Sequence, residues 1–60
     1  MNRDEKLIKQ KYRVLAPHLN ERSRRLFAAL ESKALGYGGI SIVAKITKVS
    51  RRAIHVGLRE

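Results

Sequence analysis

The amino-acid sequence predicts an all-α fold, a small domain of three to four helices with a C-terminal helix-turn-helix. Apolar side chains recur at helical spacing, cap and breaker residues divide the chain into three segments, and 60 residues provide only one small core. We therefore expect a single domain over residues 1–60. It would contain a first helix in 1–16, whose attachment stays open, a core helix in 20–35 and a helix-turn-helix in 40–60.

The first helix is predicted to run from an Asn2 cap to about Leu15, because Pro17 holds Ala16 in an extended conformation and ends the helix. Its apolar stripe consists of Leu7, Ile8, Tyr12, Val14 and Leu15. Lys11 lies within this stripe. Its methylene stem is expected to pass along the edge of the core while its charge stays in water.

The second helix is predicted to begin after an Asn20 cap, with Glu21 in the first turn, where a negative charge favours the helix dipole. Its core face is expected to contain Leu26, Phe27, Leu30 and Ala34, and its outer face Arg24, Arg25 and Ser32. Gly36 is expected to end the helix, and residues 36–39 to form a tight turn. A phosphate-binding glycine loop would need a preceding strand and a following Lys-Ser/Thr pair, which the sequence lacks.

Residues 40–60 are predicted to form two short helices joined by a turn. Ser41 can cap a helix from Ile42 to about Thr47, and Ser50 can cap a final helix that begins at Arg51. The expected core of this unit consists of Val43, Val49 and Ile54, with the small Ala44 where the helices cross. Two short helices joined by a tight turn are typical of a helix-turn-helix.

The final helix separates its side chains into two faces. The inward face is expected to contain Ala53, Ile54, Gly57 and Leu58, and the outward face Arg51, Arg52, His55, Val56 and Arg59. In a helix-turn-helix, the start of the second helix reaches base edges in the major groove, while the first helix crosses the phosphate backbone. The outward face would therefore meet DNA.

Individual roles follow from this geometry. The candidate base-reading residues are Arg51, Arg52 and His55. The candidate phosphate contacts are Ser41, Lys45, Lys48, Ser50 and Arg59. Either arginine could pair with guanine or could merely neutralise phosphate. His55 could contact a base or make no contact with DNA.

The charge of the chain indicates a polyanionic partner. Fourteen Lys and Arg residues against five Asp and Glu residues give a net charge of +9. Residues 40–60 carry five basic groups and one acidic side chain, the terminal Glu60. Residues 40–59 would therefore present no negative side chain to nucleic acid. The alternative is a charged surface that only keeps the protein in solution.

Metal binding and catalysis find little support in the sequence. With no Cys, one Asp and two distant His residues, disulfides and zinc-type ligand spacing are excluded, and we expect no cofactor. The five acidic residues are scattered, and no nucleophile, base and acid can be grouped from them. We therefore expect this chain not to be an enzyme.

The cytoplasm is the expected compartment. No apolar run approaches the roughly 20 residues of a membrane-spanning helix, and the charged residues 2–6 lack the apolar segment of a signal peptide. Two other classes of binding protein compete with a sequence-specific DNA binder. The first is a basic helix that lies on a membrane surface, and the short helices and the absence of Trp argue against it. A sequence-indifferent nucleic-acid binder would need more stacking aromatics than Tyr12, Phe27 and Tyr37.

A family resemblance extends over residues 12–60. The matching runs are Leu15-Ala16-Pro17-His18-Leu19-Asn20-Glu21-Arg22, Arg24-Arg25-Leu26-Phe27-Ala28-Ala29, Lys33-Ala34-Leu35-Gly36-Tyr37-Gly38-Gly39-Ile40-Ser41, Val43-Ala44, Val49-Ser50-Arg51-Arg52-Ala53-Ile54 and Gly57-Leu58-Arg59-Glu60. This collinear series resembles the N-terminal DNA-binding region of the Rhodopirellula-type DDE transposases of bacterial insertion sequences. Such a long match is more specific than a helix-turn-helix pattern alone.

The resemblance implies that the chain recognises the terminal inverted repeats of its element, in the bacterial cytoplasm and on the nucleoid when bound. The family's metal-dependent Asp/Asp/Glu site belongs to a separate catalytic domain, whose acidic motifs this chain does not match. Lys48 stands where such units often carry Gly, so the turn is expected to be strained or differently shaped. His55 stands where Arg is common. A stand-alone helix-turn-helix regulator remains the alternative and would favour a two-fold symmetric site.

Overall fold

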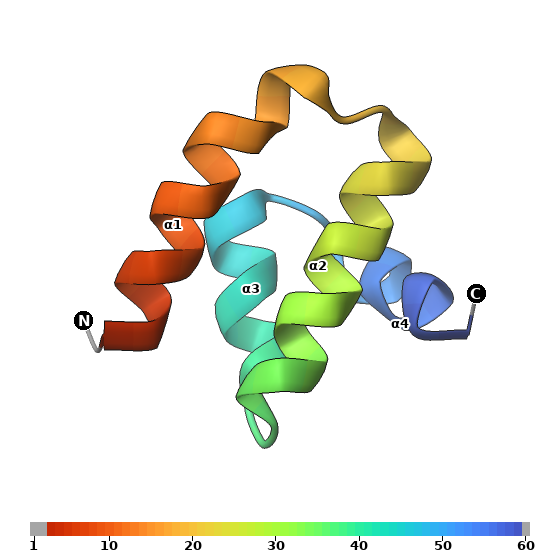
Figure 1. The fold of residues 1–60 in the computed structure, drawn as a ribbon. Coiled ribbons are helices and arrows are strands. Elements are labelled where there is room, and N and C mark those ends of the chain that lie inside the picture. Colours follow the sequence, from red (N-terminus) through yellow and green to blue (C-terminus); the bar gives the residue numbers. More distant parts are fainter. Residues whose placement is uncertain (1–2, 60) are drawn as a thin grey trace.

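The computed structural model describes residues 3–59, which form four α-helices and one 3-10 turn (Figure 1). The elements are α1 (Arg3–Leu15), η1 (Ala16–His18), α2 (Glu21–Leu35), α3 (Gly39–Thr47) and α4 (Arg51–Arg59). No strand occurs in this part of the chain. The predicted all-α class is confirmed.

Helix α2 is the central element. It packs against both α3 and α4, and α1 packs along α3 (Figure 1). The core consists of Ile8, Ala28, Val43, Val49 and Ile54, with Leu35, Ile40, Ala44, Ile46 and Ala53 partly buried around it. The predicted core of the last segment is therefore confirmed.

Helix α1 buries a narrower stripe than its sequence predicts. Of the five apolar residues expected to face the core, Ile8 is buried and Tyr12 is half-buried. The prediction is wrong for Leu7, Val14 and Leu15, which are exposed. The reason is that α1 lies at the edge of the molecule and is covered by its neighbours along one side only (Figure 1).

Two contacts attach α1 to α2. The ring of Tyr12 stacks on that of Phe27, with centroids 5.8 Å apart. The Lys11 Nζ lies 2.6 Å from the Glu31 Oε1, so Lys11 pairs with a carboxylate of α2 rather than simply passing along the core edge. The first helix is thus packed on the domain. The expected Asn2 cap lies outside the described residues.

The chain after α1 differs from the expected extended break. Ala16 is the first residue of η1, and the extended residue is Leu19, with φ −98° and ψ 132°. Pro17 lies in the first turn of η1. An N–H group at this position has no acceptor within the helix, so the proline costs no hydrogen bond. The bias against helical geometry before proline was overcome by this tight turn.

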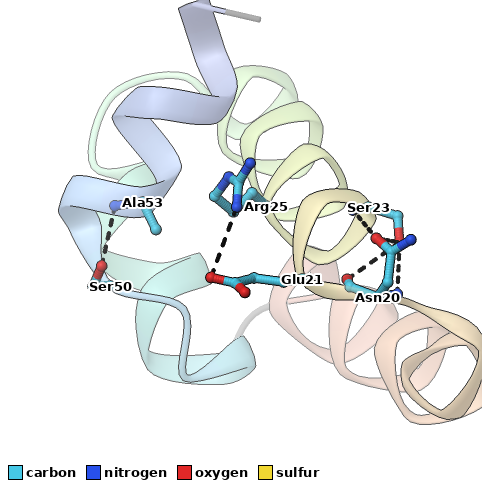
Figure 2. A network of polar contacts seen from close by, with 6 residues as sticks. All are labelled: Asn20, Glu21, Ser23, Arg25, Ser50 and Ala53. Atoms are coloured by element: carbon cyan, nitrogen blue, oxygen red, sulfur yellow. Dashed lines mark hydrogen bonds and ion pairs between the residues drawn. The ribbon is translucent and has the colours of Figure 1, made fainter.

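The start and end of α2 follow the sequence prediction. The Asn20 Oδ1 accepts a hydrogen bond from the Ser23 N–H at 2.8 Å, and the Ser23 Oγ accepts one from the Asn20 N–H at 2.9 Å. This reciprocal capping box is drawn in Figure 2, beside the Glu21–Arg25 ion pair at 3.9 Å. At the other end Gly36 has φ 78°, in the region that favours glycine.

The buried face of α2 differs from the predicted one. Its buried residues are Ala28, Ala29 and Ser32, whereas Leu30 is 66% exposed, Ala34 is exposed, and Leu26 and Phe27 are half-buried. Arg24 and Arg25, predicted to face outward with Ser32, are half-buried. Ser32 tolerates burial because its Oγ donates to the Ala28 carbonyl at 2.7 Å.

The face that α2 turns to the core is explained by the close approach of the α3 and α4 backbones to α2. A Cβ added at Gly57 of α4 would lie 2.8 Å from the Arg25 carbonyl oxygen, and one added at Gly39 would lie 2.5 Å from that of Ser32. Helices this close need small side chains between them. The face with Ala28 and Ala29 therefore turns inward, and the face with the larger Leu30 stays outside.

Helix α3 begins earlier than predicted. Its cap is Gly38, with φ 79°, and its first residue is Gly39, so the expected Ser41 cap is wrong. The left-handed conformation of Gly38 starts the helix immediately after the turn. Ser41 lies exposed in the first turn, and the helix ends at Thr47 as predicted.

Candidate nucleic-acid interface

The turn between α3 and α4 consists of Lys48, Val49 and Ser50. Lys48 has φ 63° and ψ 12°, the left-handed conformation that a non-glycine residue adopts at a cost of about 1–2 kcal/mol. Its N–H donates to the Ala44 carbonyl at 2.9 Å and so closes the last turn of α3. The strain expected from the missing glycine is therefore present.

Thr47 and Val49 fix the shape of this turn. The Thr47 Oγ1 donates to the Val43 carbonyl at 2.8 Å and accepts from the Val49 N–H at 3.2 Å, and Thr47 is buried. Val49 is also buried and belongs to the core. One hydroxyl and one apolar side chain thus hold the backbone that leads into α4.

Ser50 caps α4 as the sequence predicts. Its Oγ accepts a hydrogen bond from the Ala53 N–H at 3.0 Å (Figure 2). Its carbonyl accepts from the Ile54 N–H at 3.0 Å, the first bond of the helix. The first N–H groups of an α-helix have no acceptor within the helix and carry partial positive charge, which favours an anion at this end.

The inner face of α4 is held firmly against α2. Ile54 is fully buried, and Gly57 is buried where α4 approaches Arg25 and Ala29 of α2 most closely. Ala53 is half-buried. The prediction for Leu58 is wrong, because Leu58 is 41% exposed beside a hollow of about 330 Å³ that the chain around Gly36 leaves open.

The outer face of α4 is basic and exposed. The exposed residues are Arg51, Arg52, His55, Val56 and Arg59, the same set that the sequence places outward. Arg59 extends back along the helix, since its Nε donates to the His55 carbonyl at 3.3 Å. The three candidate base readers therefore lie within the first five residues of α4, on its exposed face.

Three candidate phosphate contacts lie together in a groove beside α3. Ser41, Lys45 and Lys48 line a hollow of about 530 Å³, together with Glu5 and Lys9 of α1. Ser41 and Lys45 are one helical turn apart, and Lys48 follows in the turn toward α4. Ser50 and Arg59 do not line this groove and lie at the two ends of α4.

The sequence did not predict the roles of two residues in this region, Thr47 and Lys9. Thr47 shapes the turn, and the available signal was a hydroxyl at the end of a helix, two residues before an apolar residue. Lys9 joins the groove only because α1 packs along α3. No local pattern in the sequence indicates that contact.

The described residues offer no cluster for metal binding and no helix for crossing a membrane. Among residues 3–59, no three His, Cys, Asp or Glu side chains gather in a way that could hold a metal ion. None of the helices that these residues form is long and apolar enough to cross a membrane. No protein-family model, curated protein or solved structure matches this chain.

Proposed function

We propose that this protein binds double-stranded DNA in a sequence-specific manner through the outer face of α4. The observation that carries the proposal is the separation of the two faces of α4: Ile54 and Gly57 anchor the helix, while Arg51, Arg52 and His55 remain exposed. A helix held in this way can enter the major groove without losing its packing. In this proposal α3, the turn and α4 act as a helix-turn-helix.

The proposed roles of the side chains follow their positions. Arg51, Arg52 and His55 read base edges, and a good bidentate arginine contact to guanine is worth about 1–3 kcal/mol of discrimination. The proposed phosphate contacts are Ser41, Lys45, Lys48, Ser50 and Arg59. The net charge of +9 supports such contacts, because it draws the protein toward a polyanion.

We further propose that the DNA site is a terminal inverted repeat of an insertion sequence. This step rests on the resemblance of residues 12–60 to the DNA-binding region of Rhodopirellula-type transposases. The chain would then act as an end-recognition module in the bacterial cytoplasm, on the nucleoid while bound. It would bind DNA and leave strand cleavage and joining to a catalytic domain.

A selection from a random duplex library tests this proposal. At physiological salt, where charges are screened beyond about 8 Å, we expect one motif to be enriched, and we expect it at both ends of a mobile element. Enrichment of a two-fold symmetric site would favour a stand-alone regulator over an end-binding module. Recovery of no motif, with binding that vanishes steeply as salt rises, would contradict sequence-specific recognition.

A further inference from the structure

The groove between α1 and α3 brings together cations from parts of the chain that are far apart in sequence. Lys9 comes from α1, Lys45 from α3, and Lys48 from the turn before α4. Figure 1 shows α1 alongside α3 over much of its length. The sequence predicts no DNA contact from α1, yet the packing of α1 adds a lysine to the predicted phosphate contacts.

Lys9 is held in place by the packing of its helix. The adjacent Ile8 is 3% exposed and belongs to the core. Tyr12 stacks on Phe27, and Lys11 pairs with Glu31, so two contacts on the α2 side fix the rotation of α1. Lys9 itself remains exposed. Its ammonium group is therefore presented at a defined place, with only the side chain to be ordered on binding.

The lining of the groove suits the backbone of a nucleic acid. Three lysines against one carboxylate, that of Glu5, leave a net charge of +2. The Ser41 hydroxyl can donate to a phosphate oxygen, and the half-buried Ile42 and Ile46 offer apolar surface to a sugar. Lys48, which lines the groove, lies two residues before Ser50, the cap of α4. The groove therefore continues the surface on which DNA would lie.

We propose that this groove binds the phosphate backbone of the duplex, and that Lys9 makes a backbone contact from outside the helix-turn-helix. This inference rests on the proposed DNA binding and extends it to α1. The backbone that α3 crosses passes through the groove, while α4 occupies the adjacent major groove. Lys9 thereby adds affinity for every duplex and no sequence preference.

Replacing Lys9 tests the contact. Lys9→Gln is expected to weaken binding to the selected duplex and to a scrambled duplex by the same factor, and to reduce the slope of log affinity against log salt by about 0.9. Equivalently, the affinity lost between 50 and 200 mM salt shrinks by about 3.5-fold. Lys33→Gln is the matched control, because Lys33 is exposed on α2 and lines a different hollow.

A second variant is expected to change the affinity in the opposite direction. Glu5→Gln removes the one carboxylate among the residues that line the groove. It is expected to tighten binding to both duplexes and to leave their affinity ratio unchanged. Circular dichroism of each variant checks that α1 remains folded, and a variant that keeps the wild-type spectrum reports on binding alone.

Site-directed cleavage locates the groove on DNA. The chain contains no Cys, so Lys9→Cys introduces a unique attachment point for an iron chelate that cuts nearby backbone. We expect cuts at one position flanking the selected motif. Lys33→Cys carrying the same chelate should give no cuts, or cuts elsewhere.

The outcomes separate this inference from the proposed function. If Arg51→Ala relaxes sequence preference while Lys9→Gln and Lys33→Gln behave alike, the groove proposal fails and α4 recognition stands. If no motif is enriched but Lys9→Gln still lowers the salt slope, the groove proposal stands and sequence specificity fails. If the wild-type chain binds no duplex even at 50 mM salt, both fail.

Discussion

The side chains of the proposed DNA-binding surface differ in what their removal should do. A residue that reads a base contributes only on the correct sequence, whereas a residue that holds phosphate contributes on every sequence. In the proposed function, the exposed arginines at the start of α4 belong to the first kind. The exposed Lys45 in the groove belongs to the second.

Substitution of the two arginines tests this division. Arg51→Ala or Arg52→Ala is expected to lower the affinity for the selected duplex by about 1–3 kcal/mol and to leave scrambled DNA less affected. Lys45→Ala should weaken both duplexes equally. The measurement is a pair of binding isotherms for each variant. Equal losses on both duplexes for all three variants would contradict the assignment.

The left-handed Lys48 permits a test by stability. Lys48→Gly removes the conformational strain and should raise the free energy of unfolding by up to about 1 kcal/mol, after allowing for the greater freedom of glycine when unfolded. Thermal melting should show a rise of a few degrees, since about 1 kcal/mol corresponds to about 4–8 °C in a domain of this size.

The matched control places the same glycine in a helix. Lys45→Gly, at an exposed position of α3, should lower the melting temperature because glycine is unfavourable within helices. A fall in the melting temperature of Lys48→Gly would show that the turn does not hold Lys48 in the left-handed conformation.

At the scale of the helices, the rotation of α2 about its axis, here called its phase, decides which of its apolar residues are buried and so contribute to stability. Ile54→Ala should destabilise the fold by about 2–5 kcal/mol, because Ile54 is fully buried. That is comparable with the whole stability of so small a domain. Leu30→Ala should change it by less than about 0.5 kcal/mol, because Leu30 is 66% exposed. Similar melting temperatures for the two variants would refute the observed phase.

The contact between α2 and α4 gives a second test at this scale. Gly57→Ala places a Cβ 2.8 Å from the Arg25 carbonyl oxygen, so α4 must shift. We expect a loss of about 1–3 kcal/mol despite the better helix propensity of alanine. Val56→Ala, on the exposed outer face, is the control and should be nearly neutral. A Gly57→Ala variant as stable as the wild type would contradict the close approach.

The helices themselves could be predicted from the sequence because their boundaries depend on local chemistry. The Asn20 and Ser50 caps and the Gly36 stop each act within a few residues. The outer face of α4 could also be predicted, because its basic residues share one side of the helix, whereas Leu58 was wrongly placed on the inner face. The boundary at Ser41 was wrong, because the left-handed Gly38 acts as the cap instead.

The phase of α2 could not be predicted from its own residues. Leu30 makes a convincing apolar stripe with its neighbours, but the preference for Ala28 and Ala29 comes from Gly39 and Gly57 on other helices. The same holds for Lys9, which reaches the groove through the packing of α1 on α3. The buried face of α2 and the place of Lys9 depend on contacts between helices, which the apolar pattern of one helix does not reveal.

At the scale of the whole molecule, the four helices of residues 3–59 support an exposed basic surface on a very small core. The Cα radius of gyration is 10.2 Å, and the principal extents are 27 × 26 × 15 Å. Helix α2 packs on both α3 and α4 and so sets the position of α4 relative to the groove beside α1. This arrangement suits the proposed simultaneous contact with a major groove and its backbone.

The proposed DNA binding through α4 is tested most directly by an amide NMR titration of the chain with the selected duplex at about 0.15 M salt, near which charges are screened beyond about 8 Å. We predict that shift changes concentrate at 41–59, with a smaller set around Lys9, and that the amides near the outer residues Leu30 and Ala34 stay unchanged. Changes centred on that outer face of α2, or no changes at excess duplex, would contradict DNA binding through α4.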